Sequence, residues 1–352
     1  KYVKGRKVTD PFAGSGDLLN WATKYSASSI RGFDVDKSLK SKIISINDSL
    51  LNPQQYQFVI TNPPYLNVNK ADQAIKDKYF KSKKFEDLYQ ISLESIMNSE
   101  EGLIVVPINF LSAENSRKIR DIFFKKFEIK KINLFKHQVF SDTTYNVISF
   151  YYKKRKQFTE VSKIQMTMFP EKQEISLELR QEHGWQFGGD FLKEINEVKN
   201  SLGVKRLTED LLDHGTEEIV LAIQNPKHKI LRKISPATKK ILQDNIMILK
   251  AIDSKNGEKI MLDDIRKYDV KAIVGKNTSR NIAHLILSKP LPVEEQENLI
   301  TKFNNTLEEI RNKYFSLFLT NFRDNGRKRI SFDFSYKFLN YLHQQEKRRE
   351  LL

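Results

Sequence analysis

The sequence predicts an α/β protein with two domains: a doubly wound, mostly parallel sheet in residues 1–155 and an α+β domain in residues 156–352. Two observations predict this fold class. Short apolar runs alternate with segments of helical periodicity over the first 150 residues, and a glycine-rich loop follows the first run. In the polar stretch 153–165, which begins "KKRKQFTE", the alternation ends and an irregular pattern begins. We therefore place the domain boundary at residue 155.

The elements of the first domain follow one another in a regular order. Its strands are predicted at residues 7–9, 29–36, 43–48, 57–61, 102–107 and 129–135, with a last pair around 143–152. Its helices are predicted at 18–25, 37–42, 85–97 and 112–127, the last with Ser112 as its N-cap. Two helices of the second domain are predicted at 291–314 and 334–350. Because ligands of doubly wound sheets bind at the carboxyl ends of the strands, we expect the loops there to form a site.

Composition narrows the class of partner. A net charge of +16 and a pI near 9.6 over 352 residues favour a polyanionic partner, most simply nucleic acid. The alternative is an AT-rich genome that enriches the chain in lysine. The absence of cysteine excludes disulfides, thiolate zinc sites and a cysteine nucleophile. No apolar run approaches transmembrane length, so we expect a cytoplasmic protein, in a prokaryotic cell or a viral host, without a membrane partner. The six histidines show no metal-ligand spacing, so we expect no catalytic metal.

The glycine loop "VTDPFAGSGDLL" indicates the first ligand. Gly14 and Gly16 allow a tight turn and a close approach of backbone to ligand. The loop lacks the third glycine of a dinucleotide site and the GK[ST] of a P-loop, and Asp10 and Asp17 would repel a phosphate. An acidic loop suits a positively charged ligand such as S-adenosylmethionine, which carries an ammonium and a sulfonium. The alternative is a tight strand–helix turn without a ligand.

Acidic residues end the next two predicted strands. Asp34 in "GFDVD" stands where nucleoside-binding α/β folds bind a ribose diol, with Asp36 as the competing residue. Asp48 in "SINDSLLNP" stands where a carboxylate accepts a hydrogen bond from an adenine amino group. The alternatives are a solvated turn acid for the first two residues and a cap for Asp48.

The turn Asn62-Pro63-Pro64-Tyr65 follows the fourth strand and carries the expected chemistry. The Asn62 side-chain oxygen and the Pro63 carbonyl can accept both hydrogens of an exocyclic amine, which directs the nitrogen lone pair at a methyl donor. Two prolines make the turn rigid, and Tyr65 offers a face on which a planar base can stack. A simple Pro-Pro turn is the alternative reading.

Together "DPFAGSG", "GFDVD", "NDSLL" and "NPPY" resemble, in order and spacing, the S-adenosylmethionine-dependent DNA adenine-N6 methyltransferases of restriction–modification systems, in the γ arrangement. The blocks "FEDLYQISLESIM", "GLIVVPINFLS", "VFSDTTYNVISF" and the tail "KYFSLFLTNFRDNGRKRISFDF" are similar as well. The resemblance implies a Rossmann-like methyltransferase sheet followed by a target-recognition domain. It also implies methyl transfer to N6 of a flipped-out adenine in double-stranded DNA, within a type II system that includes a cognate restriction endonuclease.

The resemblance also assigns residues. Catalysis falls to Asn62, Pro63, Pro64 and Tyr65, with the target base between Tyr65 and Phe140. The residues assigned to the cofactor are Asp10, Phe12, Ala13, Gly14, Gly16, Asp34, Val35, Asp48, Ser49, Asn62 and Pro64. Ser49 departs from the aromatic residue that relatives often have there. Relatives usually have a further cofactor-binding segment before the glycine loop, and we expect one that the sequence given does not include.

Basic residues of the second domain are expected to contact DNA. They are Lys227, Lys229, Arg232, Lys233, Lys276, Arg280, Arg323, Arg327, Lys328 and Arg329. Each alone is better explained by a solvated surface charge. Three other functions stay open: methyl transfer to another amine (cytosine N4, rRNA guanine N2 or a protein glutamine), a non-catalytic DNA-specificity subunit, and a piece of a larger restriction–modification polypeptide.

Overall fold

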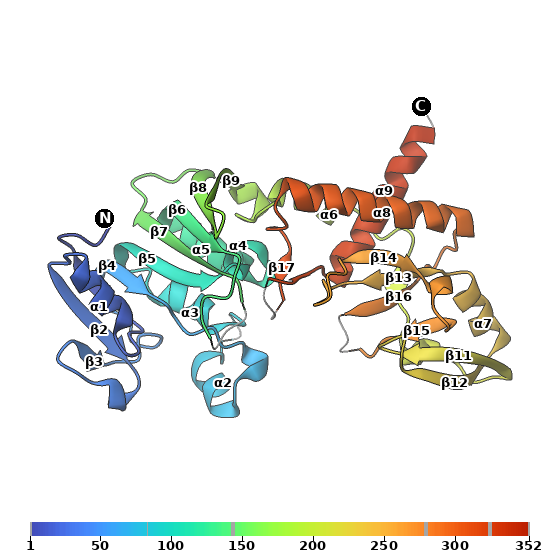
Figure 1. Ribbon diagram of the computed structural model, residues 1–352, viewed down its shortest axis with the longest axis horizontal. Helices are drawn as coiled ribbons and strands as arrows, with labels where there is room; N and C mark the ends of the chain where they lie inside the picture. The colour runs from blue at the N-terminus through green and yellow to red at the C-terminus, as the bar shows by residue number, and fades with distance from the viewer. Residues whose placement is uncertain (1, 83, 142–144, 278–280, 323–325, 351–352) are drawn as a thin grey trace. The chain divides into compact units, whose positions relative to one another are not determined.

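The computed structural model describes residues 2–82, 84–141, 145–277, 281–322 and 326–350, and the chain divides into two compact units (Figure 1). The first unit comprises Lys1–Gly189 with Arg323–Gly326, and the second comprises Asp190–Phe322 with Arg327–Leu352. Within the described ranges, none of the helices combines the length and the apolar composition that a membrane crossing requires.

A nine-stranded sheet is the centre of the first unit and has the strand order β3-β2-β1-β4-β5-β7-β6-β8-β9. Strands β1 to β5 pair in parallel, whereas β7 is antiparallel to both β5 and β6. The chain order reverses between β1 and β4, which is where doubly wound sheets open a ligand crevice. The predicted fold class is confirmed. The strands are β1 (Lys7–Asp10), β2 (Ser29–Asp34), β3 (Ile44–Ile46), β4 (Tyr56–Thr61), β5 (Ser99–Pro107), β6 (Phe127–Phe135), β7 (Val147–Lys154), β8 (Val161–Phe169) and β9 (Gln173–Arg180).

Helices connect these strands and pack on the sheet through apolar side chains. Leu19 and Ala22 of α1 are fully buried in a cluster with Val8 of β1 and Phe58 of β4. Phe123 of α5 makes edge-to-face contacts with aromatic rings of β7. The helices are α1 (Asp17–Lys24), α2 (Gln73–Tyr79), α3 (Leu88–Ser95), α4 (Asn109–Ser112) and α5 (Arg117–Lys126), with 3-10 turns η1 (Lys37–Leu39), η2 (Val68–Lys70), η3 (Glu114–Ser116) and η4 (Gln181–His183).

The first unit extends beyond the boundary predicted at residue 155, and this corrects the domain prediction. Strand β8 pairs in parallel with β6, and β9 pairs antiparallel with β8. Ile164, Met166 and Met168 of β8 are buried, so the strand adds to the core of the same sheet. The polar stretch "KKRKQFTE" is therefore a connection within the sheet, and the first unit ends at Gly189.

Three local predictions also differ from the structure. Residues 37–42 contain only the turn η1, which Asp36 caps by accepting from Ser38 N and which ends at Lys40, where ψ is 129°. Ser112 ends α4 rather than capping a helix, Ala113 is extended, and the predicted long helix begins only at Arg117. Helix α2 was not predicted; the Asp72 carboxylate caps its N-terminus by accepting from Ile75 N at 2.8 Å.

The second unit mixes small sheets with helices. One sheet has the order β10-β16-β13-β14, a second β12-β11-β15, and a third pairs β17 with β18. Helices α8 and α9 lie close to the two predicted helices. The elements are α6 (Gly189–Asn196), β10 (Lys205–Arg206), η5 (Glu209–Leu211), β11 (Glu217–Ile223), β12 (Lys229–Ile234), α7 (Pro236–Gln243), β13 (Met247–Lys250), β14 (Met261–Asp264), η6 (Ile265–Lys267), β15 (Ala272–Val274), β16 (Ile282–Ile286), α8 (Val293–Lys313), β17 (Thr320–Asn321), β18 (Lys328–Arg329) and α9 (Phe332–Glu350).

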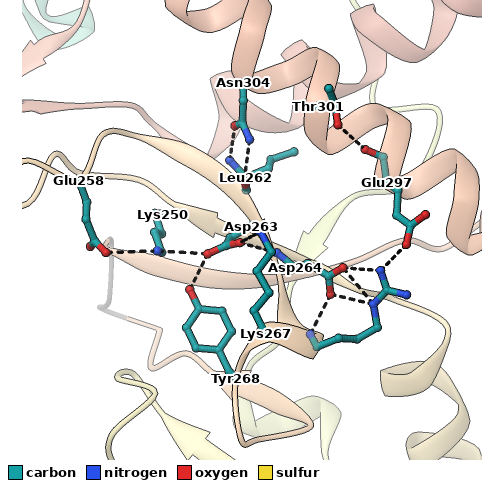
Figure 2. Close-up of polar contacts among 11 residues, drawn as sticks. Lys250, Glu258, Leu262, Asp263, Asp264, Lys267, Tyr268, Glu297, Thr301 and Asn304 are labelled. Carbon is teal, nitrogen blue, oxygen red and sulfur yellow. Dashed lines mark hydrogen bonds and ion pairs between the residues drawn. The ribbon is translucent and has the colours of Figure 1, made fainter.

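Polar side chains join β14 to α8 in the second unit (Figure 2). The Asn304 side chain bonds both the N–H and the carbonyl of Leu262, each at 2.8 Å. Arg266 donates to the Asp264 carboxylate and pairs with Glu297 of α8. The Asn304 contacts satisfy the backbone groups of Leu262, and the Arg266 contacts link the Asp264 side chain to α8.

Asp263 of β14 lies among cations and a phenol (Figure 2). Its carboxylate receives Lys267 Nζ at 2.9 Å, the Tyr268 hydroxyl at 2.8 Å and Lys250 Nζ at 3.2 Å. Burial alone would raise the pKa of Asp263, but these partners outweigh burial and keep its pKa well below the usual range. Asp263 therefore remains ionised throughout the neutral range.

Candidate functional site

A cavity of about 600 Å³ in the first unit gathers most of the predicted site residues. Nine of the residues predicted for cofactor binding, catalysis or base stacking contribute to its lining. The lining consists of Phe12, Gly14, Asp34, Val35, Asn62, Pro63, Pro64, Tyr65, Leu66, Asn67, Lys70, Phe140 and Tyr145. The glycine loop, the end of β2 and the turn after β4 therefore open onto one space, at the carboxyl ends of parallel strands.

The glycine loop forms one wall of this cavity. Gly14 has φ +51°, and its N–H donates to Asp34 Oδ2 at 2.8 Å. The other Asp34 oxygen accepts from Asp36 N at 2.9 Å, so the carboxylate is oriented by two backbone groups. A Cβ added at Gly14 would meet no atom within 4 Å, which means that this backbone borders open space. Asp34 lines the cavity, whereas Asp36 caps η1.

Asp10 lies at the end of β1 and is almost completely buried. Its Oδ1 accepts from the Thr61 hydroxyl at 2.7 Å and from Phe12 N at 3.0 Å, which ties the glycine loop to β4. Burial raises the pKa of Asp10 to about 7; the two hydrogen bonds oppose this shift and the charge of Asp34 adds to it. Asp10 is not part of the described lining; it positions the glycine loop that borders the cavity.

The turn after β4 presents Asn62 and Tyr65 to the cavity. The Tyr65 hydroxyl donates to Asn62 Oδ1 and lies 3.0 Å from the Val105 carbonyl of β5. Pro63 is buried and Pro64 exposed. The bond between Tyr65 and Asn62 was not predicted from the sequence, which assigned the tyrosine only a stacking face. It orients the amide and leaves a second lone pair of the Asn62 oxygen for another donor.

Phe140 lies in the same cavity as Tyr65, as the sequence predicted. Four lining residues were missed: Leu66, Asn67, Lys70 and Tyr145. Asn67 caps η2 through Asn69 N and donates to Asp87 at 2.9 Å, and an asparagine shortly after two prolines was a signal for such a cap. Tyr145 belongs to the block "VFSDTTYNVISF" that contains Phe140, so its proximity could have been inferred.

Four residues predicted to bind the cofactor fall outside the described lining: Ala13, Gly16, Asp48 and Ser49, in addition to Asp10. Asp48 Oδ2 accepts from the Tyr79 hydroxyl at 2.9 Å and pairs with Lys78 Nζ at 2.8 Å. Burial would raise the pKa of Asp48, but these two partners outweigh burial and lower it. The sequence could not indicate this contact, because α2 was itself not predicted.

The predicted DNA-contacting residues differ in exposure. Exposed members are Lys227, Lys229, Lys233 and Lys276, and partly exposed members are Arg232, Arg327 and Arg329. Lys328 departs from the prediction: its side chain is buried, and this burial lowers its pKa to about 8. A buried ammonium cannot contact a phosphate at the surface. Arg280 and Arg323 lie outside the described residues.

Among the described residues, no group of three His, Cys, Asp or Glu side chains has the arrangement of a metal site.

Comparison with known proteins gives one family match. Residues 12–140, just over a third of the chain, match the family described as Eco57I restriction-modification methylase. No curated protein sequence matches the chain.

Several solved structures are similar. The type IIL restriction-modification enzyme MmeI in complex with DNA is 9% identical, with a TM-score of 0.49 over 82% of this chain and 57% of that one. The type IIG restriction endonuclease BpuSI is 12% identical, with a TM-score of 0.45 over 96% and 55%. A methyltransferase subunit of a type I restriction-modification system from Streptococcus thermophilus is 17% identical, with a TM-score of 0.35 over 47% and 42%. The chain thus spans about half the length of these proteins.

Proposed function

We propose that the protein transfers a methyl group from S-adenosylmethionine to N6 of an adenine flipped out of double-stranded DNA, as the modification part of a type II restriction–modification system. One observation carries the proposal: Asp34, Gly14, the turn Asn62–Tyr65 and Phe140 line a single cavity of about 600 Å³. The family match over residues 12–140 supports the reaction class.

The residues present fit the cofactor. Gly14 borders open space, so backbone can approach a ligand there, and the Asp34 carboxylate faces the same cavity with both oxygens oriented by N–H groups. Asp34 would accept from the ribose hydroxyls, and Val35, which is exposed, would contact the adenine ring. The predicted contact of Asp48 with the amino group of the cofactor is not part of this proposal, because Asp48 lies outside the cavity lining and pairs with Tyr79 and Lys78.

The turn would position the target amine. When bound, S-adenosylmethionine supplies a methyl group on a positively charged sulfur. Asn62 would accept one hydrogen of the amine through the lone pair that Tyr65 leaves open, and the Pro63 carbonyl would accept the other. Fixed acceptors direct the nitrogen lone pair, so the reaction needs positioning and electrostatic stabilisation rather than a strong base.

Aromatic side chains would receive the base after it leaves the duplex. Unstacking and unpairing cost a few kcal/mol, and stacking against Tyr65 and Phe140 would offset part of this. Backbone contacts with DNA are assigned to the exposed cations Lys227, Lys229 and Lys276. A cognate restriction endonuclease would be the functional partner, and the cytoplasm, where the DNA lies, the site of action.

The test is transfer of a labelled methyl group to double-stranded DNA, followed by nucleoside analysis. We expect N6-methyladenine at a defined sequence. N4-methylcytosine would contradict the adenine assignment, and label in rRNA or in protein glutamine would contradict the DNA assignment. Cofactor binding without transfer to any substrate would indicate a specificity subunit.

A further inference from the structure

A second pocket, of about 410 Å³, lies within the second unit, and of its lining only Arg329 is among the residues predicted to contact DNA. It draws on four separate elements: the end of β10, the segment after β15, β18 and the start of α9. We call it the Arg206 pocket, and its lining is Arg206, Asn277, Arg329, Ile330, Ser331, Phe332 and Tyr336. The volume lies in the range of small-ligand sites.

The charge of the pocket favours an anion. Its described lining contains two arginines and no carboxylate. Two carboxylates are exposed nearby. Hydrogen bonding, first with the Thr208 side chain, lowers the pKa of Asp210, and the charges of Lys205 and Arg206 add to this shift. Asp333 pairs with Lys337 at 2.8 Å. By contrast, another cavity of the same unit, of about 680 Å³, includes Glu194 and Glu197 in its lining. That cavity also includes Lys199, so the Arg206 pocket differs from it in having a cationic lining without carboxylates.

The rings of the pocket favour a planar partner as well. The Arg206 guanidinium lies 5.3 Å from the centre of the Phe332 ring, and it donates to Asn277 O at 2.7 Å, which limits its motion. The rings of Phe332 and Tyr336 are nearly parallel, at 15° and 6.3 Å between centres. Guanidinium planes and aromatic faces are the surfaces on which unstacked nucleic-acid bases stack, while arginine forks bind phosphate.

We propose that the Arg206 pocket binds one unstacked nucleotide of a DNA strand, its phosphate on Arg206 and Arg329 and its base against the aromatic side chains. The choice of DNA rests on the proposed function. The pocket is separate from the residues assigned to methyl transfer, since its lining belongs wholly to the second unit.

The first experiment measures binding of a fluorescent oligothymidylate and of a paired hairpin duplex to the full chain, without cofactor. Arg206→Ala should weaken binding of the oligothymidylate about tenfold, and reduce its salt dependence, while duplex binding changes less. Lys240→Ala is the matched control, because Lys240 is an exposed cation on α7 outside the pocket. Equal effects of the two substitutions would overturn the proposal.

A second measurement needs no substitution. Photo-crosslinking of a 5-iodouracil oligonucleotide to the unaltered protein should label Phe332 or Tyr336, and labels confined to other segments would overturn the proposal. Binding of the corresponding oligouridylate about tenfold tighter than the DNA, or of thymidine monophosphate as tightly as the oligonucleotide, would also overturn it.

The two proposals fail separately. Loss of oligothymidylate binding in Arg206→Ala, together with no methyl transfer by the unaltered protein, would remove the proposed function and leave the pocket. Methyl transfer to adenine with unchanged binding by Arg206→Ala would do the reverse.

Discussion

Asp10 in the first unit and Asp263 in the second both lie in sheet strands and both have buried side chains, yet their pKa values move in opposite directions. Asp10 receives only a hydroxyl and a backbone N–H, and the nearby charge of Asp34 is negative. Asp263 receives two ammonium groups and a phenol. Asp10 is thus held by neutral donors, whereas Asp263 is held by ion pairs.

The largest expected effect separates two asparagines with different tasks. Asn62→Ala should lower methyl transfer about a thousandfold, because one acceptor for the target amine is lost, while cofactor binding stays nearly unchanged. Asn304→Ala is the comparison: it leaves Leu262 N–H and C=O unpaired and should cost about 2 kcal/mol of stability without affecting transfer by the folded protein. Single-turnover transfer assays and denaturant unfolding measure the two. Full turnover by Asn62→Ala would remove its catalytic assignment.

The next effect concerns pH and Asp10. Its pKa is raised from 3.8 to about 7 in the folded protein, so the native state binds more protons than the unfolded state between these values. Its contribution to stability is therefore complete below pH 4 and declines by about 4 kcal/mol as the pH rises to 7. Asp10→Asn should abolish this decline, which denaturant unfolding at several pH values measures. An unchanged pH profile in the variant would show that Asp10 titrates normally.

Asp263 should behave with the opposite sign. Its pKa is lowered in the folded protein, so its contribution is present at neutral pH and is lost as the pH falls below the ordinary value of 3.8. Asp263→Asn should cost about 3 kcal/mol at pH 7, since Lys250 and Lys267 lose their shared anion. The same unfolding series measures the cost, and a cost that persists undiminished in acid would contradict the ionic origin.

Two glycines give a smaller contrast in packing. A Cβ on Gly32 of β2 would come within 2.7 Å of the Ala13 Cβ and 2.8 Å of a Leu19 methyl, so Gly32→Ala should cost about 2 kcal/mol. Gly275 in the second unit is the control, because an added Cβ would meet Leu207 O at an ordinary 3.4 Å. Thermal unfolding compares the two variants, and equal losses would rule out the packing explanation.

The smallest effect tests the second aromatic wall. Phe140→Ala should lower kcat/KM for methyl transfer about tenfold, because one stacking surface for the base is lost. Phe158→Ala is the control in the same unit, since Phe158 is exposed and lies outside the cavity. Loss of activity in Phe140→Leu as well as Phe140→Ala, with retention in Phe140→Trp, would separate stacking from mere occupancy of space, and full activity of Phe140→Leu would contradict the stacking role.

The sequence predicted the order of strands and the main cavity residues because local signals coincide there. Glycines, prolines and acids stand at the ends of apolar runs, and the topology of a doubly wound sheet brings such ends together. It did not predict β8, although Ile164, Met166 and Met168 alternate, because the preceding polar stretch resembled a domain linker.

Other misses depend on contacts between distant residues. Helix α2 packs through Ile75 and Tyr79 in a small cluster with Leu50 and Leu88, a grouping that no local pattern reveals. The burial of Lys328 was missed for the same reason. A lysine between two arginines predicts an exposed side chain, and only the pairing of β17 with β18 shows that it faces inward.

The two outer strands of the nine-stranded sheet have a consequence for association between copies. β3 has only three residues, and β9 carries exposed polar or charged side chains at Gln173, Glu174, Ser176, Glu178 and Arg180. A short edge strand and an edge strand with charged side chains are both poor templates for backbone pairing with another chain. Aggregation by edge-to-edge growth of this sheet is thereby disfavoured, even though its interior is rich in apolar β-formers.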